Sequence, residues 1–232
     1  MIKALLLGSA AQSALILSGL VVYVVRVPTK VIGALAGFGA GALVAAISFD
    51  LIPESEALGQ VELALWLLLG AAVFVVSDRV VEARFGGGDQ SSGPAPLGIV
   101  VGSVVDGVPE SAIFGIQIAT GQAISAAFLG AVFISNIPQA LAPSADLAAS
   151  GWKWTKLVGM WAVVVIACGV TAGLGYAVAD VSGATGDRAA AIAAGGLLAM
   201  LTDSLMPYAF DRGGSWAGAW TVVGFAASLA ST

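Results

Sequence analysis

The hexapeptide D-G-V-P-E-S at residues 106–111 lies inside the apolar run 97–119. The same D-x-x-P-E-S pattern occurs at residues 50–55, at the end of another apolar run. Two related hexapeptides follow, S-N-I-P-Q-A at 135–140 and S-L-M-P-Y-A at 204–209, in which hydroxyl, amide or phenol groups replace the carboxylates. Carboxylates are costly inside a lipid bilayer, where they mark ion pathways. The motif therefore predicts polar chemistry within a membrane.

The composition of the chain is that of an integral membrane protein. Hydrophobic residues make up 59% of the 232 residues and charged residues only 10%, and the mean hydropathy is +0.99. These values lie far outside the range of soluble domains. The net charge of −5 is spread over the connections between apolar runs, so the lipid bilayer is an expected partner and nucleic acid is not.

Eight apolar runs approach or reach the roughly 17 to 25 residues that a membrane-spanning helix needs. Their continuity favours helices over the alternating polarity of a barrel. We therefore predict an all-α integral membrane protein with a single transmembrane domain, 1–232. Helices one to three occupy about 4–80, four and five about 97–144, and six to eight about 155–231, and a flexible cytoplasmic linker occupies about 82–96. The predicted spans are 4–25, 31–53, 61–80, 97–119, 123–144, 155–179, 189–208 and 216–231.

The positive charges predict how the chain is oriented, because Lys and Arg are in excess in cytoplasmic loops. Seven of the nine Lys and Arg residues follow odd-numbered spans, and only Lys3 and Arg188 lie on the other side. Both termini are thus predicted to lie outside a plasma (inner) membrane that the chain crosses several times. The seven are Arg26, Lys30, Arg79, Arg84, Lys153, Lys156 and Arg212.

The four prolines of the motifs are placed symmetrically. Pro53 and Pro207 fall in spans two and seven, whereas Pro109 and Pro138 fall in spans four and five. This placement predicts a 3+2+3 arrangement, in which spans one to three and six to eight are inverted repeats around a central pair. A proline inside a membrane helix also leaves one backbone carbonyl free, which can bind a cation.

Polar side chains on the two central spans predict a binding site between them. Ser103, Asp106, Glu110 and Gln117 share one helical face of span four, because their spacing follows the helical repeat. Span five offers Ser135, Asn136 and Gln139. Hydrogen bonding between helices is the alternative role for Ser103, Ser135 and Gln117. The carboxylates of Asp106 and Glu110 need a cation or proton at that depth, since neither central span offers a Lys or Arg.

These motifs resemble the ZIP (Zrt-, Irt-like) family of divalent metal transporters. The family's H-N-x-x-D/E-G on helix four aligns with 102–107, H-N-x-P-E-G on helix five with 135–140, and H-L-L-P-E-A on helix two with 50–55, with every histidine replaced. The resemblance implies eight helices, both termini outside, and a binuclear or mononuclear metal site between helices four and five. Asp106, Asn136 and Gln139 would be ligands, with Ser103 and Ser135 at two further positions. A second metal lacks support, because 155–179 contains no carboxylate.

The ligand atoms that the chain offers restrict which metal ion it could bind. Zinc favours imidazole and thiolate, and this chain has no His. Oxygen ligands suit Mn²⁺, Fe²⁺, Mg²⁺ or Ca²⁺, so we expect one of these as the transported substrate, without a resident cofactor. Asp50 and Glu54, with Glu56 and Glu62, are predicted to form an acidic outer vestibule, and Asp203 in span seven is predicted to lie on the exit toward the cytoplasm.

Other functions remain open at this stage. The loss of every family histidine also fits a non-transporting ZIP-like scaffold or sensor, and Asp106 and Glu110 would equally serve a carrier of protons or another non-metal cation. Enzymatic activity is not expected, because the chain has no His and no nucleophile elbow. The family resemblance is compatible with a homodimer.

Overall fold

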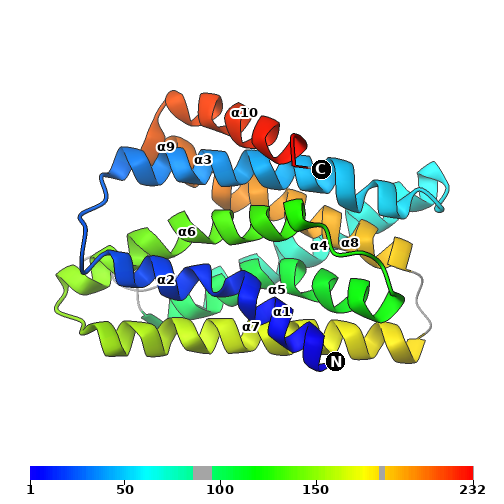
Figure 1. Cartoon of the computed structure of the whole chain (residues 1–232), viewed down its shortest axis with the longest axis horizontal. Coiled ribbons are helices and arrows are strands. Elements are labelled where there is room, and N and C mark those ends of the chain that lie inside the picture. Colours follow the sequence, from blue (N-terminus) through cyan, green and yellow to red (C-terminus); the bar gives the residue numbers. More distant parts are fainter. Residues whose placement is uncertain (86–95, 183–185, 232) are drawn as a thin grey trace.

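A computed structural model describes residues 1–85, 96–182 and 186–231 of the chain, and in this part every regular element is helical (Figure 1). The predicted all-α class is confirmed. The helices lie alongside one another along the longest axis of the molecule (Figure 1). The α-helices are α1 (Ile2–Gln12), α2 (Ala14–Val21), α3 (Thr29–Ala46), α4 (Gln60–Phe85), α5 (Pro96–Thr120), α6 (Ala126–Ala149), α7 (Trp154–Ser182), α8 (Gly186–Met200), α9 (Met206–Gly213) and α10 (Trp216–Leu229).

Seven helical stretches in the described residues are long and apolar enough to cross a membrane. Two are composite: α3 continues through a π-helical turn, η1 (Ile47–Leu51), and a 3₁₀ turn, η2 (Pro53–Ser55), while α8 continues through the π-helical turn η3 (Leu201–Leu205) into α9. The eighth predicted span corresponds to α10, which has only 14 residues. The linker predicted from residue 82 begins later, because α4 runs to Phe85; residues 86–95 lie outside the described part.

The first predicted span, 4–25, is interrupted at Ser13. The Ser13 N–H bonds the Ala10 carbonyl at 3.1 Å, and its Oγ donates to the same oxygen at 2.7 Å. Such a tight turn separates α1 from α2, and α2 ends at Val21 rather than near residue 25. The break comes directly after Gln12, the last residue of α1.

The two π-helical turns occupy matching positions. Both η1 and η3 end two residues before a proline, Pro53 in one span and Pro207 in the other. One turn earlier, the Ser48 hydroxyl bonds the Val44 carbonyl at 2.8 Å, and the Thr202 hydroxyl bonds the Leu198 carbonyl at 3.0 Å. Proline removes a helical donor and crowds the preceding turn, which accounts for the local widening.

Glycines bring two helix pairs into close contact in the same way. A Cβ added at Gly41 of α3 would overlap the Thr221 carbonyl of α10, and one added at Gly195 of α8 would overlap the Leu67 carbonyl of α4. Gly41 and Gly195 each stand twelve residues before the proline of their own span. Close backbone approach at small residues stabilises helix pairs in lipid. The pairs α3–α10 and α4–α8 thus use equivalent positions.

Glycines at helical spacing also form packing faces on α3 and α7. Gly33 and Gly37 of α3 lie against the backbone of Gly213 and Ala217, and Gly169 of α7 lies against Ser9 of α1. The larger buried cluster of apolar side chains lies between α3, α6 and α8 and includes Leu43, Val132 and Leu197. Small residues therefore make the helix contacts, and larger apolar side chains fill the space between them.

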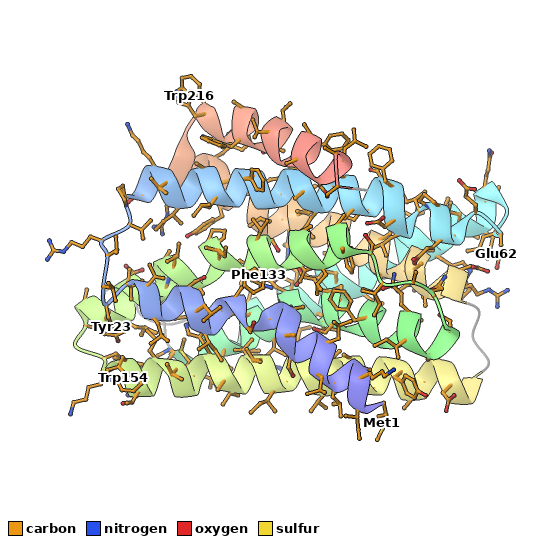
Figure 2. All side chains as sticks on the ribbon, viewed as in Figure 1. Met1, Tyr23, Glu62, Phe133, Trp154 and Trp216 are labelled. Atoms are coloured by element: carbon orange, nitrogen blue, oxygen red, sulfur yellow. The ribbon has the colours of Figure 1, made fainter. Side chains whose placement is uncertain are left out.

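The two ends of the helical bundle differ in chemistry. Tyr23 and Trp154 lie at one end, whereas Glu62 lies at the opposite end (Figure 2). At the first end, the Tyr23 hydroxyl donates to the Trp152 carbonyl at 2.6 Å, and the Lys156 ammonium lies 3.9 Å from the Trp152 ring centroid. Aromatic and basic side chains at a helix end are typical of a membrane–water interface. The N- and C-termini both lie in the half of the molecule that carries Glu62 (Figures 1 and 2).

Candidate ion-binding site

Glu110 of α5 is the buried centre of the polar side chains. Only 1% of its surface is exposed, and its Oε2 accepts a hydrogen bond from Nε2 of Gln12 at 2.8 Å. Gln12 itself is fully buried at the end of α1. Sequence reasoning overlooked Gln12, although a lone amide in the apolar run 4–25 was a usable signal.

Helix α6 brings two predicted residues to this region. Asn136 and Ser135 are both buried, and the Asn136 side chain lies near the Glu110 carboxylate. Both also donate to the Val132 carbonyl, Asn136 through Nδ2 and Ser135 through Oγ, each at 2.9 Å. These bonds stabilise the turn of α6 that faces Glu110. The two central helices share few close contacts, because α5 packs chiefly against α7 and α6 packs chiefly against α3.

Several buried oxygens in the cluster lack a donor. Oε1 of Glu110 and Oε1 of Gln12 are buried and have no hydrogen-bond partner among the described residues, and neither has Oε1 of Gln117. Each unsatisfied buried acceptor costs about 1–3 kcal/mol. A bound cation or a proton would satisfy the unpaired Glu110 oxygen, so the arrangement is suited to binding one.

The remaining predicted ligands lie at the edge of this cluster. Asp106 is half-buried one helical turn before Glu110, and the charges of the two carboxylates act on each other. Ser103 and Gln139 are also half-buried. No side-chain hydrogen bond joins Asp106, Ser103 or Gln139 to the cluster in the described part of the chain. The structure thus gathers Glu110, Asn136 and Gln12 most closely.

A second polar group lies toward the end of the molecule that carries Glu62. Asp50 of η1 accepts a hydrogen bond from the Ser125 hydroxyl at 2.8 Å. Glu54 of η2 accepts bonds from Nε2 of Gln117, at 3.0 Å to Oε1 and 3.1 Å to Oε2. The Asp50 and Asp187 charges both act on Glu54. Asp50 and Glu54 therefore form one acidic group with Ser125 and Gln117 as hydrogen-bond donors.

The other two vestibule residues are placed differently. Glu62 forms an ion pair with Arg188, at 3.0 Å between Oε1 and Nη2, and Glu56 is exposed on the connection after η2. The ion pair between α4 and α8 could not be predicted from sequence spacing, because its residues are separated by 126 positions.

A third acidic group lies on the opposite side of Glu110 along the helices. Asp78 of α4 is half-buried, and the charges of Glu82 and Asp203 act on it. Asp78 also acts on Asp106. Asp203 is exposed in η3. Sequence reasoning did not assign Asp78 a role, although a carboxylate within the predicted span 61–80 pointed to one.

The described residues contain no group of three or more His, Cys, Asp or Glu side chains that could hold a metal ion. An ion at Glu110 would therefore be held by one or two carboxylates together with amide oxygens. Such a site binds weakly and favours hard cations.

Fold and site together define a multi-helix protein with membrane-spanning character and a buried carboxylate–amide cluster. No family model matches the chain, and no curated protein matches it.

Proposed function

We propose that the chain is a ZIP-like transporter that moves a divalent metal cation across the plasma membrane toward the cytoplasm. The substrate ion binds between α5 and α6, where Glu110 and Asp106 supply charge. Asn136, Gln139, Ser103 and Ser135 supply neutral oxygens. The ion is one of the hard divalent cations, Mn²⁺, Fe²⁺, Mg²⁺ or Ca²⁺.

One observation carries the proposal. The buried carboxylate of Glu110 has one oxygen without a donor, and Gln12, whose amide N–H bonds the other oxygen, also has an unpartnered carbonyl oxygen. A carboxylate at this depth needs a compensating cation or proton. Two unsatisfied acceptor oxygens on hydrogen-bonded neighbours offer ligands to a cation, and their small number fits the weak binding that release requires.

Acidic groups on both sides of Glu110 support a path for the cation. Asp50 and Glu54 lie toward the end that carries Glu62, and Asp78 and Asp203 lie toward the other. Clusters of one sign of charge raise the local concentration of counter-ions. We infer that the cation enters past Asp50 and Glu54, binds beside Glu110, and leaves past Asp106, Asp78 and Asp203.

The matched helix contacts support movement by alternating access. The pairs α3–α10 and α4–α8 use equivalent glycines, and η1 and η3 precede equivalent prolines. This correspondence is expected of inverted repeats in a 3+2+3 arrangement with both termini outside. Transporters with inverted repeats expose a central site alternately to each side.

Flux measurements in liposomes test the proposal. The purified natural protein and the variants Glu110→Gln and Asp106→Ala are each reconstituted into liposomes. Their rates of uptake of Mn²⁺, Fe²⁺, Mg²⁺, Ca²⁺ and Zn²⁺ are then compared. Exposed Glu56→Gln is the control. We expect flux of at least one hard ion, reduced at least about tenfold in both site variants, since each removes a charge from the pathway. Equal flux in Glu110→Gln and in the natural protein would refute the assignment.

Proton carriage is the second candidate, because the described residues lack a third carboxylate near Glu110. A proton satisfies one unpaired carboxyl oxygen without further ligands. Liposomes containing a pH-sensitive dye distinguish the two: a proton carrier changes the internal pH without any divalent ion, and Glu110→Gln abolishes that change. A scaffold or sensor moves neither ion.

A further inference from the structure

A cavity of about 490 Å³ lies between α4, α5 and α8, apart from the Glu110 cluster. Its walls are mostly apolar side chains and glycines from these three helices, and Val178 and Ala179 of α7 complete them. Representative lining residues are Gly70, Phe74, Val105, Ala112, Ile192 and Gly196.

The cavity has the length of one bilayer leaflet. Along α4 it extends from Trp66 to Ser77, and along α5 from Val105 to Ile116. Each stretch covers about 16 Å at 1.5 Å per helical residue. The hydrocarbon core of a bilayer is roughly 30 Å thick, so one leaflet contributes about half of it.

The chemistry of the walls requires an apolar occupant. Polar side chains line the cavity only toward its ends, Ser77 at one and Arg188 with Trp66 at the other. A water molecule needs two to four polar partners, and apolar cavities stay dry. The outer side of α4 exposes Leu65, Leu68 and Val76, which indicates that lipid surrounds it. An acyl chain is therefore the available apolar group.

The end of the cavity at Arg188 is suited to a lipid headgroup. The guanidinium carbon of Arg188 lies 5.7 Å from the centroid of the Trp66 ring. Glu62 accepts from Nε of Arg188 at 3.1 Å and pairs with Nη2 at 3.0 Å. A guanidinium has five N–H donors in a planar fork, so donors remain for a phosphate. Trp and Arg near the start of their helices match the depth of the membrane interface.

We propose that this cavity binds a phospholipid, with one acyl chain between α4, α5 and α8 and the headgroup phosphate on Arg188. Pro109, which precedes Glu110, lines the same cavity. The bound chain therefore contacts the helix that carries the candidate ion site. The proposal does not depend on transport, because it rests on cavity shape and wall chemistry alone.

Binding of dioleoyl phosphatidylglycerol to the full chain tests the proposal. The protein is delipidated in detergent, and bound lipid is counted by native mass spectrometry as lipid is added. We expect one saturable phospholipid per chain. Ala112→Phe fills the cavity and lowers this affinity at least about tenfold, the change that a loss of 1.4 kcal/mol produces. Val170→Phe, on the exposed side of α7 and outside the cavity, leaves it unchanged.

Variants of Arg188 distinguish the contribution of the headgroup phosphate to binding from that of the acyl chain. Arg188→Gln weakens phospholipid binding while Arg188→Lys retains part of it, and neither variant changes binding of oleyl alcohol, which has no phosphate. Val108→Phe is a second filling variant for the case in which Ala112→Phe does not fold.

Fluorescence quenching gives an independent measurement. A phospholipid with brominated acyl chains should quench the fluorescence of Trp66, and this quenching is the difference between the natural protein and Trp66→Phe. Unchanged binding in a folded filling variant, or no Trp66-dependent quenching, would overturn the proposal.

Discussion

Gln12 donates a hydrogen bond to Glu110 at 2.8 Å across 98 positions of the sequence, and both side chains are buried. The bond joins α1 to α5 at the turn where Ser13 interrupts the first span. A neutral amide thus holds one carboxylate oxygen in place, while the other oxygen stays unpaired. This pair is the basis of the first prediction.

Gln12→Met removes the amide and keeps an unbranched side chain of similar length. We expect the variant to lose about 1–3 kcal/mol of stability, because the buried Glu110 carboxylate loses a donor. Thermal unfolding in detergent measures the loss. In the double variant with Glu110→Gln, the combined loss is smaller than the sum of the single losses, since both changes remove the same contact. Strictly additive losses would show that the contact has no energetic role. Leu6→Met, on the exposed side of α1, serves as control.

Gly41→Ala and Gly195→Ala are expected to destabilise the protein by similar amounts. Each new Cβ overlaps a carbonyl oxygen, that of Thr221 or Leu67, and overpacking of this kind costs roughly 1–3 kcal/mol. Gly102→Ala is a matched control, because a Cβ there meets no atom within 4 Å. Thermal unfolding compares the three variants. A large effect in only one of the first two would contradict the equivalence of the two helix pairs.

Asp78→Asn should slow cation flux about three- to tenfold while leaving the fold intact. The carboxylate acts on both Asp106 and Asp203, so its loss lowers the cation concentration near the exit. Initial rates in liposomes, at low and high salt, measure the effect. The difference from the natural protein should shrink as salt rises, because ions screen this field. A salt-independent difference would point to direct ligation instead.

Gln139→Glu should tighten Mn²⁺ binding about tenfold, because it adds a third carboxylate to Asp106 and Glu110. Ser135→His should instead favour Zn²⁺, which prefers imidazole nitrogen. Isothermal titration in detergent measures both affinities. Unchanged affinity in both folded variants would mean that these side chains of α6 do not reach the ion.

Much of the fold could be predicted from the local properties of the sequence. The apolar runs predicted helices, and the structure has helices in these regions. Such features depend on neighbouring residues in the chain, because lipid compatibility and helical periodicity are local properties. The extension of α4 to Phe85 and the break at Ser13 were missed, since helix ends depend on packing and backbone hydrogen bonds.

The sequence by itself determined that the chain is helical, apolar enough for a membrane, and provided with carboxylates beside prolines in several spans. Only the tertiary structure decided which polar groups meet: Gln12 with Glu110, Gln117 with Glu54, and Arg188 with Glu62. The physical reason is that burial of apolar surface and helical hydrogen bonding act along the chain. The partner of a buried polar group depends instead on which helices become neighbours, and that follows from the close packing of small residues on several helices at once.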